Sequence, residues 1–507
     1  MNFKRTPLII FVSVFSLLSS CVFSGNSSDP SKDDLTINVI AFNDFHGAIE
    51  EQNNRMGLAK LGTYLKQQSN KENTLILSQG DDWQGSIYSN HNRGRLVNDV
   101  YAYCRVSART IGNHDFDWGI ESLEDNTKTG YDGYVTPVLA ANVFDYDFAT
   151  KTEGDVQISD IGVPSVTHEL ENGLKVGIVG IIGRDQITTI TSSMTEDICF
   201  KEHITVLKSE ATKLREEGCN IIIASCHGGQ SNLLGNQLER FVDLVLCGHT
   251  HKNERTVENK LHYYQFGCYG NTIGNITLTY NQSTKKVAVS DVESVTASTV
   301  SRYVTTIDSK ISSLINTYWN SCEQEAQVVV ASSVTGTFYN TDQCANLMAK
   351  AIFERAVAEG HDDVILGYNN QSRYTLSYGS WDYADLYQAF PFDNIVYIES
   401  VKGSDILYEV ASYNNVYISP TFDCKIDPDG YYKIAVIDYL LYHTNDDREY
   451  NYFDHFDGEP DDELSQNYRL ILKDWLIDNG YANGKNINAS DYSSYNESFD
   501  GSRLTSI

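Results

Sequence analysis

Five short segments of this 507-residue chain each end an apolar run with residues that commonly bind metal ions. In chain order they are Asp44-Phe45-His46, Gly80-Asp81, Gly112-Asn113-His114-Asp115, His227-Gly228-Gly229 and Gly248-His249-Thr250-His251. Histidine, aspartate and asparagine suit metals such as zinc, manganese, iron or cobalt, whereas calcium prefers sites made of oxygen alone. Their order and shared context predict two metal sites, built from loops at one edge of a sheet.

Two neighbouring divalent metals would explain this set of residues chemically. Such a centre binds phosphate oxygens, lowers the pKa of a bridging water and holds that water in line with the phosphorus. The chain contains no Cys-x-x-Cys pair, so a structural zinc site of that kind is not expected. The pattern therefore indicates phosphoester hydrolysis.

The charge of the chain limits its partners. The formal net charge is -30, which argues against binding nucleic acid or anionic membranes through a broad basic surface. An anionic substrate must then be attracted locally, and bound divalent cations would do so. We therefore expect a small-molecule phosphoester as the partner and no nucleic acid.

The elements that must position the five segments alternate between strands and helices from residue 35 to about 300. Residues 58–65 have helical spacing, and short apolar runs that predict strands occupy 36–42, 74–77, 175–179, 221–224 and 244–246. Near-continuous apolar strands suit a sheet that is covered on both faces. Ligands of such a sheet belong at the strand ends and in the loops that follow them, where every motif above is placed.

A second unit follows, over residues 326–507. Val304, Ile307, Ile311, Leu314 and Tyr318 recur at spacings of three and four, which predicts an amphipathic helix over 301–325 that joins the two units. In the second unit we expect a helix over 344–358 and strands over 327–332, 364–366 and 395–398.

The N-terminus has the pattern of a targeting segment. Lys4 and Arg5 precede the apolar stretch 8–18, which is too short to span a bilayer as an ordinary helix. Leu18-Ser19-Ser20-Cys21 resembles the bacterial lipobox, so we expect a signal peptide over 1–21, a lipidated Cys21 and a polar tether over 22–34. The alternative is a plain secretory signal. Either reading places the protein outside the cytoplasm, and the first anchors it to a membrane.

Together, the five ordered segments resemble the calcineurin-like metallophosphoesterases, and with the C-terminal unit the chain resembles the 5'-nucleotidase family in particular. The resemblance covers roughly residues 35–480. It implies an α/β fold: a metallophosphoesterase β-sandwich flanked by helices, joined by the bridging helix to a second α/β (α+β) substrate-binding domain.

The resemblance also implies a role for each matching residue. Two divalent ions (Zn, Mn, Fe, Co or Mg) would be held, the first by Asp44, His46 and His251, and the second by Asn113, His227 and His249. Asp81 would bridge them. His114 would contact the scissile phosphate, and Asp117 would keep His114 oriented. Asp82 and Asp115 are interpreted as structural residues.

The C-terminal unit keeps part of the family's substrate signature. Phe390-Pro391-Phe392-Asp393-Asn394 resembles a family stretch, whereas the family's glycine-rich substrate loop is replaced by 368–373, which keeps Arg373 but has no glycine. The family's Gly-Gly-Asp-Gly loop is replaced by 442–450. Arg373 is expected to contact substrate, with a surface arginine as the alternative. For the family's aromatic clamp on the base, the candidates are Tyr417 and either Tyr450 or Tyr452, and chance placement is the alternative.

Three functions remain open. The first is a 5'-nucleotidase-type phosphohydrolase that releases phosphate from nucleotides outside the cytoplasm. The second keeps the metal chemistry but acts on a non-nucleotide phosphoester, a UDP-sugar or a cyclic nucleotide. The third is a surface binding protein on an enzyme-like scaffold, and the complete ligand set argues against it.

Overall fold

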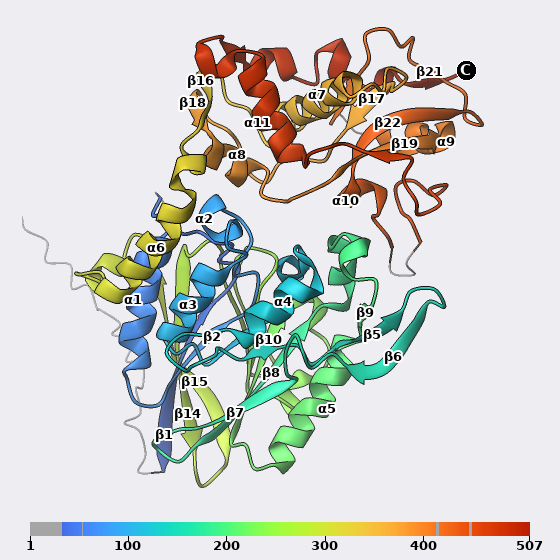
Figure 1. The fold of residues 1–507 in the computed structure, drawn as a ribbon. Helices are drawn as coiled ribbons and strands as arrows, with labels where there is room; N and C mark the ends of the chain where they lie inside the picture. Colours follow the sequence, from blue (N-terminus) through green and yellow to red (C-terminus); the bar gives the residue numbers. More distant parts are fainter. Residues whose placement is uncertain (1–32, 53, 412–414, 446–448) are drawn as a thin grey trace, which may run out of the picture.

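The fold is taken from a computed structural model, which describes residues 33–52, 54–411, 415–445 and 449–507. The expected signal peptide, Cys21 and the tether up to residue 32 lie outside these ranges. Within the described ranges, no helix has the length and apolar character needed to cross a membrane. The chain forms two domains, with the C-terminal one above the N-terminal one in Figure 1.

The N-terminal domain is a sandwich of two six-stranded sheets. The first sheet runs in the order β15 (Lys286–Thr296), β14 (Thr272–Asn281), β1 (Asp34–Phe42), β2 (Thr74–Ser78), β3 (Ala108–Thr110) and β4 (Val138–Leu139). The second runs in the order β12 (Asn253–Glu258), β13 (Leu261–Phe266), β11 (Leu244–Cys247), β10 (Ile221–His227), β8 (Lys175–Ile182) and β7 (Ser165–Glu169). Apolar side chains from both sheets, such as Val39, Leu77, Ile178 and Ile223, form one buried core between them.

Helices cover the outer faces of the sandwich. α1 (Gly57–Ser69) and α3 (Arg95–Tyr103) lie outside the first sheet, and α5 (His203–Glu216) lies outside the second. Shorter elements complete the domain: α2 (Ile87–Asn90), the 3-10 helix η1 (Asn113–Phe116), α4 (Gly119–Lys128), and a small sheet of β6 (Thr152–Gln157), β5 (Val143–Asp147) and β9 (Ile198–Phe200). These layers match the predicted β-sandwich with flanking helices.

The direction of the strands places the five segments together. β1, β2, β3 and β4 are parallel neighbours in one sheet, and β8, β10, β11 and β13 are parallel neighbours in the other. The carboxyl ends of parallel neighbours meet at one edge of their sheet. The loops after β1, β2, β3, β10 and β11 carry the five segments and meet at the edge that faces the second domain.

The connecting helix begins later than predicted. α6 spans Ser309–Ala326, so Val304 and Ile307 precede it. The side chain of Asp308 accepts hydrogen bonds from the backbone N–H groups of Lys310 and Ile311, and this N-cap sets the start of the helix. The helical spacing of apolar residues begins before Asp308, so spacing alone predicts a start that is too early.

The C-terminal domain has its own sheet and helices. Its five-stranded sheet runs β20 (Val416–Ile418), β17 (Leu366–Tyr368), β22 (Tyr431–Ile437), β19 (Val396–Lys402) and β23 (Asp462–Glu463). A three-stranded sheet runs β18 (Gly379–Asp382), β16 (Val329–Thr335) and β24 (Ile487–Asn488). The remaining elements include α7 (Gln343–Ala358), α8 (Tyr383–Ala389), α9 (Gly403–Asp405), α10 (Asp438–Leu441), α11 (Tyr468–Asp478), β21 (Lys425–Ile426) and β25 (Thr505–Ser506).

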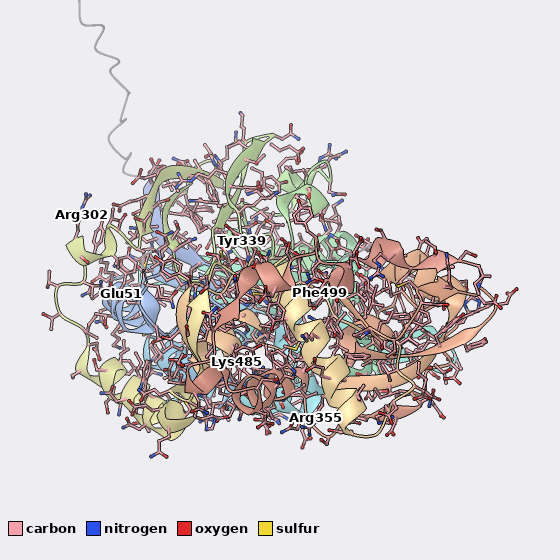
Figure 2. All side chains as sticks on the ribbon, turned by 90° about the horizontal axis from the view of Figure 1, so that it is seen from above. Glu51, Arg302, Tyr339, Arg355, Lys485 and Phe499 are labelled. Atoms are coloured by element: carbon pink, nitrogen blue, oxygen red, sulfur yellow. The ribbon has the colours of Figure 1, made fainter. Side chains whose placement is uncertain are left out.

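The two domains touch directly through hydrogen bonds. Asn90 Nδ2 donates to the backbone oxygen of Pro391 (2.8 Å), and Ser192 Oγ donates to the backbone oxygen of Tyr442 (2.8 Å). Figure 2, seen from above, shows Tyr339, Lys485, Arg355 and Phe499 on the C-terminal domain and Arg302 at the outer edge of the molecule. α10 lies on the underside of the C-terminal domain, toward the edge of the sandwich that carries the five segments (Figure 1).

Candidate active site

The first group of predicted ligands meets where β1 and β11 end. Ligand atoms of Asp44, His46 and His251 lie within 4.8 Å of one another. The Nε2 atoms of His46 and His251 are 3.0 Å apart, and His251 Nε2 lies 3.5 Å from Asp44 Oδ1. Two ring nitrogens that face each other across 3.0 Å with a carboxylate beside them form a donor set that could hold a divalent cation.

The second group lies next to the first. Ligand atoms of Asp81, His227 and His249 are within 4.8 Å of one another. Asn113 Oδ1 is 3.0 Å from His227 Nε2 and 3.1 Å from His249 Nδ1, so the amide oxygen joins this group. Asp81 Oδ2 lies 3.2 Å from His227 Nε2 and 3.7 Å from His46 Nε2, which places one carboxylate between the two groups.

Backbone carbonyls orient two of the histidine rings. His227 Nδ1 faces the carbonyl oxygen of Gln79 at 2.7 Å, and His46 Nδ1 faces that of Gln84 at 3.0 Å. A carbonyl oxygen only accepts, so each Nδ1 carries a proton, and Nε2 is the ring nitrogen that is left to bind an ion. This is the tautomer that metal binding needs, and the residues of both groups fit two divalent ions.

The electrostatics of the two groups are closely linked. Burial opposes ionisation of Asp81, but the neighbouring His227 outweighs it and holds the pKa of that carboxyl well below its usual range. Burial likewise opposes protonation of His227, but Asp81 raises the pKa of the ring to about 9. Burial lowers the pKa of His249 to about 4 and that of His46 well below its ordinary value. The imidazoles of His249 and His46 are therefore neutral, as metal ligands must be.

The backbone at these ligands is strained. Five predicted ligands lie in the left-handed region: Asp44 (φ 50°), His46 (φ 49°), Asp81 (φ 54°), His249 (φ 72°) and His251 (φ 59°). Residues other than glycine rarely adopt this conformation, and it tends to cluster where function needs a fixed geometry. The spacing of the motifs gives no sign of this strain.

Two glycines allow the loops to come close enough. A Cβ atom on Gly112 would lie 2.1 Å from Asp81 Oδ1, and one on Gly80 would lie 2.9 Å from His227 Nδ1. Gly80 also has φ +91°, which other residues rarely adopt. Gly80 and Gly112 are therefore part of the site, because a side chain at either position would collide with a predicted ligand.

His114 lies beside the metal groups and links them to the second domain. Its Nδ1 is 2.9 Å from Asp117 Oδ2, and its backbone N–H donates to Asp81 Oδ1 (2.9 Å). Arg373, from the C-terminal domain, donates through Nη1 to His114 Nε2 (3.2 Å) and through Nη2 to His46 Nε2 (2.8 Å). Burial raises the pKa of Asp117, and His114 opposes that shift. The structure therefore brings Arg373, His114 and Asp117 together with the two groups.

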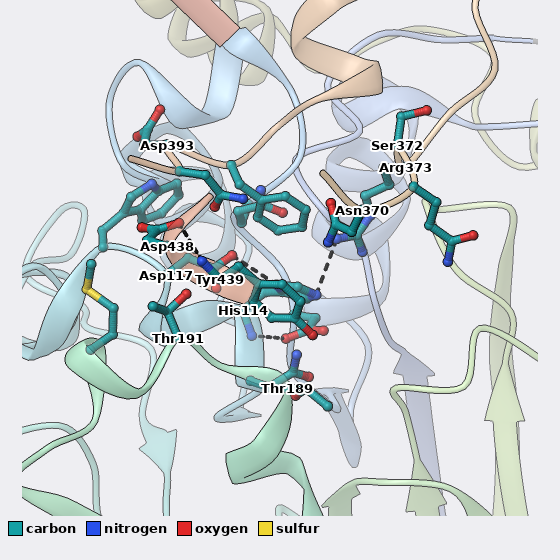
Figure 3. Close-up of a pocket in the computed structure, with 18 of the residues that line it drawn as sticks. His114, Asp117, Thr189, Thr191, Asn370, Ser372, Arg373, Asp393, Asp438 and Tyr439 are labelled. Atoms are coloured by element: carbon teal, nitrogen blue, oxygen red, sulfur yellow. Dashed lines mark hydrogen bonds and ion pairs between the residues drawn. The ribbon is translucent and has the colours of Figure 1, made fainter. Parts of the chain in front are cut away.

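A cavity of about 460 Å³ lies between the domains above these residues. Figure 3 shows Asp117, Asp393, Asp438 and Thr191 on one side of it and the segment with Asn370, Ser372 and Arg373 on the other. The cavity is lined by residues of both domains, including Asp81, Asn113, His114, His249, His251, Tyr269, Arg373, Phe392 and Tyr439. Among the described residues that line it, Arg373 is the only arginine or lysine.

The expected aromatic clamp residues Tyr417 and Tyr450 are not part of this cavity. Tyr417, in β20, is 8% exposed and its ring packs against Phe353 of α7 (centroids 5.1 Å apart), so its side chain faces the helix and not the cavity. Tyr450 packs against Phe456 (4.9 Å) within its own segment. The sequence-based expectation for both tyrosines is corrected accordingly. The alternative, Tyr452, stacks on His443 (centroids 4.5 Å apart).

Phe392 and Tyr439 supply aromatic rings to the cavity instead. The ring of Phe392 stacks near His114, with centroids 5.5 Å apart and planes 29° apart. Phe392 lies in Phe390-Pro391-Phe392-Asp393-Asn394, the stretch expected above to belong to the substrate signature, and Tyr439 lies in α10. The sequence marks the segment that contains Phe392, but it does not show which aromatic rings face the cavity.

The N-terminal domain is similar in sequence to known phosphoesterases. Residues 37–253 match a family model described as calcineurin-like phosphoesterase. A 5'-nucleotidase of Diplobatis ommata is 30% identical over 261 residues, covering 48% of this chain and 42% of that protein. The endonuclease YhcR of Bacillus subtilis is 24% identical over 455 residues, covering 82% of this chain and 35% of that protein. The chain thus spans less than half the length of either relative.

The fold is also similar to solved structures. A crystal structure of a 5'-nucleotidase precursor from Thermus thermophilus superposes with a TM-score of 0.71 at 17% identity, covering 89% of this chain and 97% of that chain. At this identity the likeness concerns the fold. It extends over both domains, because it covers most of each chain.

Proposed function

We propose that this chain, whose residues 37–253 match the calcineurin-like phosphoesterase family model, is a metal-dependent phosphohydrolase of the 5'-nucleotidase type. It would hydrolyse nucleotides to nucleoside and phosphate. One observation carries the proposal. The Asp81 carboxylate stands between two groups that could each hold a divalent ion, and both groups border the cavity that Arg373 enters from the other domain.

Each residue of the metal groups would have a distinct task. One ion would be held by Asp44, His46 and His251, and the other by Asn113, His227 and His249. Asp81 would bind both ions. The bound ions would polarise phosphate oxygens and lower the pKa of the attacking water. No nucleophile from the protein is needed.

His114 and Arg373 would stabilise the charge that develops on the phosphate. His114 Nδ1 donates to the Asp117 carboxylate (2.9 Å), and the ring lines the cavity. To stabilise the phosphate, the ring would carry a second proton on Nε2 and donate it to a phosphate oxygen, and Asp117 would stabilise the resulting imidazolium and hold its orientation. The Arg373 guanidinium stays charged and presents two N–H groups toward the same place, which suits the oxygens of one phosphate.

The rest of the cavity favours a monophosphate whose alcohol part carries an aromatic base. Arg373 is the only arginine or lysine among the described residues that line the cavity. One cationic side chain suits the charge of a single phosphate better than that of a di- or triphosphate. Phe392 and Tyr439 offer ring faces on which a base can stack. A nucleoside monophosphate therefore fits best.

A second candidate substrate is a phosphoester without a base, a UDP-sugar or a cyclic nucleotide. The observation that favours it is the replacement of two family substrate loops, by residues 368–373 and 442–450. A binding protein without activity is disfavoured by the complete set of ligands. For its location we propose a membrane-anchored position outside the cytoplasm, at the cell surface or in the periplasm, with Cys21 as the lipid anchor, on the basis of the lipobox-like Leu18-Ser19-Ser20-Cys21.

Phosphate release tests the proposal. The protein would be stripped of metal, reloaded with manganese or zinc, and offered AMP, UMP, ATP, UDP-glucose, a cyclic nucleotide, a sugar phosphate and an aryl phosphate. We expect metal-dependent release with the highest kcat/KM for a nucleoside monophosphate. Release from the aryl or sugar phosphate alone would move the assignment to the second candidate, and no release with any metal would reject both.

A further inference from the structure

A buried arginine outside the cavity joins the two loops that carry Asp81 and His114. Arg109, in β3, is 0% exposed. Its Nε donates to Asp82 Oδ2 (3.0 Å) and its Nη2 donates to Asp115 Oδ2 (2.7 Å). Asp82 directly follows Asp81, and Asp115 directly follows His114. One guanidinium therefore spans the loop after β2 and the loop after β3.

The Asp82 end of this bridge is held from several sides. The Asp82 carboxylate also accepts from Ser78 Oγ (2.8 and 2.9 Å) and from the hydroxyl of Tyr101 (3.0 Å). Ser78 and Arg109 are paired in register across the parallel strands β2 and β3. The guanidinium carbon of Arg109 lies 3.8 Å from the centroid of the Trp83 ring, so its plane is fixed as well.

The Asp115 end is tied to the backbone of the ligand loop. Asp115 Oδ2 accepts from the backbone N–H of Gly112 (2.8 Å), directly before Asn113. A fully buried group of two carboxylates and one guanidinium is a weak source of stability, because desolvation offsets much of the attraction. The forked geometry of arginine, by contrast, fixes the separation of two carboxylates in a way that no single point charge can.

We infer that Arg109 is a positioning residue, which sets the distance between Asp81 and the Asn113–His114 pair by holding the neighbours Asp82 and Asp115. Asp82 and Asp115, which the sequence analysis interprets as structural residues, would then hold Arg109 in place. The inference rests on the proposed function, since it assigns Arg109 to the metal centre. Arg109 acts through the ligands' neighbours and touches no substrate.

Arg469 provides a matched control in the other domain. It is also buried (2% exposed), donates through Nη2 to a carboxylate oxygen of Asp393 (2.5 Å), and its guanidinium carbon lies 3.5 Å from the centroid of the Tyr387 ring. Through Nη1 it donates to the backbone oxygen of Phe392 (2.5 Å). Arg469 thus braces the Phe392 loop on the substrate side as Arg109 braces the metal loops.

The test compares Arg109→Lys with Arg469→Lys in the full chain, after metal stripping, by calorimetric titration with Mn²⁺. Lysine keeps the charge but replaces the planar fork by a single ammonium group, which cannot hold the two carboxylates at the same separation. We expect Arg109→Lys to weaken at least one Mn²⁺ site by about tenfold or more, the usual scale for residues that orient metal ligands. Its phosphatase activity should recover as Mn²⁺ is raised. Arg469→Lys should bind Mn²⁺ as the wild type does and show a higher KM.

The outcomes separate the inference from the proposed function. Wild-type Mn²⁺ affinities in Arg109→Lys would overturn the inference, and so would equal losses in both lysine variants. A wild-type protein that binds no Mn²⁺ would instead reject the proposed function. If Arg109→Lys does not fold, Asp115→Asn takes its place, because it keeps the volume and an acceptor oxygen but loses the charge that holds Arg109. The same weakening of Mn²⁺ binding is expected there.

Discussion

The two sides of the cavity are built in different ways. On the metal side, short loops follow buried parallel strands and bond to one another through their backbones: Asp44 N–H donates to the oxygen of Gly80 (3.0 Å) and His46 N–H to that of Asp81 (2.9 Å). On the substrate side, Arg373 and Phe392 come from longer segments of the C-terminal domain. The candidate metal ligands are therefore fixed by short loops at the edge of the sandwich, whereas the residues proposed to contact the substrate lie on longer loops of the C-terminal domain.

This difference explains which parts of the family pattern the chain keeps. A ligand in the left-handed conformation, such as Asp81 or His249, depends on neighbours that leave it no other arrangement. A substrate loop can change length or composition without disturbing the sandwich core, because loops tolerate substitution better than the elements that they connect. We expect the two sides to respond differently to mutation, in kcat on one and in KM on the other.

The largest effect in this comparison is expected at His114. His114→Ala should lower kcat by about 10²- to 10⁴-fold and leave KM nearly unchanged, because the residue would act on the charge that develops during reaction. Steady-state kinetics with AMP measure this. His91→Ala, at a partly exposed histidine outside the site, is the control and should behave as the wild type. Equal kinetics for His114→Ala and the wild type would remove His114 from the mechanism.

Arg373 should show an intermediate effect, since it joins the two sides. Arg373→Met should lower kcat/KM for AMP by about tenfold to a hundredfold, the scale of one or two hydrogen bonds to a charged group. Arg373→Lys should recover part of the loss, because the charge remains but the planar fork does not. If the methionine variant kept full kcat/KM, the surface-arginine alternative would be supported in spite of the contacts to His114 and His46.

A smaller effect is expected at the aromatic rings of the substrate side. Phe392→Leu and Tyr439→Leu should each raise KM for AMP by about tenfold, the scale of one base–aromatic stack, and change KM for a sugar phosphate little. Tyr417→Leu is the matched control, because its ring packs away from the cavity against Phe353. A larger rise in KM for Tyr417→Leu than for the other two would restore the sequence-based choice.

The smallest effect concerns stability and pH, at Asp438 on the substrate side. Burial, with Asp393 and Glu463 nearby, raises the pKa of this carboxyl to about 7. Because the folded-state pKa lies above the ordinary value, the folded protein gains stability as the pH falls from about 8 through 7 toward 5. Asp438→Asn should therefore raise the thermal midpoint by a few degrees at about pH 8 and by less at about pH 5. An unchanged pH dependence of the midpoint in Asp438→Asn would contradict this account.

Much of the metal side could be predicted from the sequence, and much of the substrate side could not. Asp44 and Asp81 follow apolar strands whose direction brings their loops together, so local pattern suffices there. The role of Arg109 could not be predicted, because an arginine inside a strand belongs to no motif and its partners Asp82 and Asp115 are far apart in the chain. Tyr417 matches the expected position of a clamp residue in the sequence, but side chains alternate between the two faces of β20, and its ring faces α7. Side-chain direction in rewritten loops depends on packing that no short pattern encodes.

The boundaries of elements show the same limit. The apolar spacing that begins at Val304 predicted a helix from 301, whereas the Asp308 cap starts α6 at Ser309. The spacing located the helix correctly, and a single hydrogen-bonding side chain decided where it begins.

The central claim is that Asp81 bridges two ions that carry the reaction. Metal-stripped wild type and Asp81→Asn would be titrated with Mn²⁺ while phosphate release from AMP is followed. We expect wild-type activity to rise from near zero to a plateau at two ions per chain, and Asp81→Asn to stay at background. Full activity of the stripped protein, a plateau at one ion, or wild-type activity in Asp81→Asn would contradict the account.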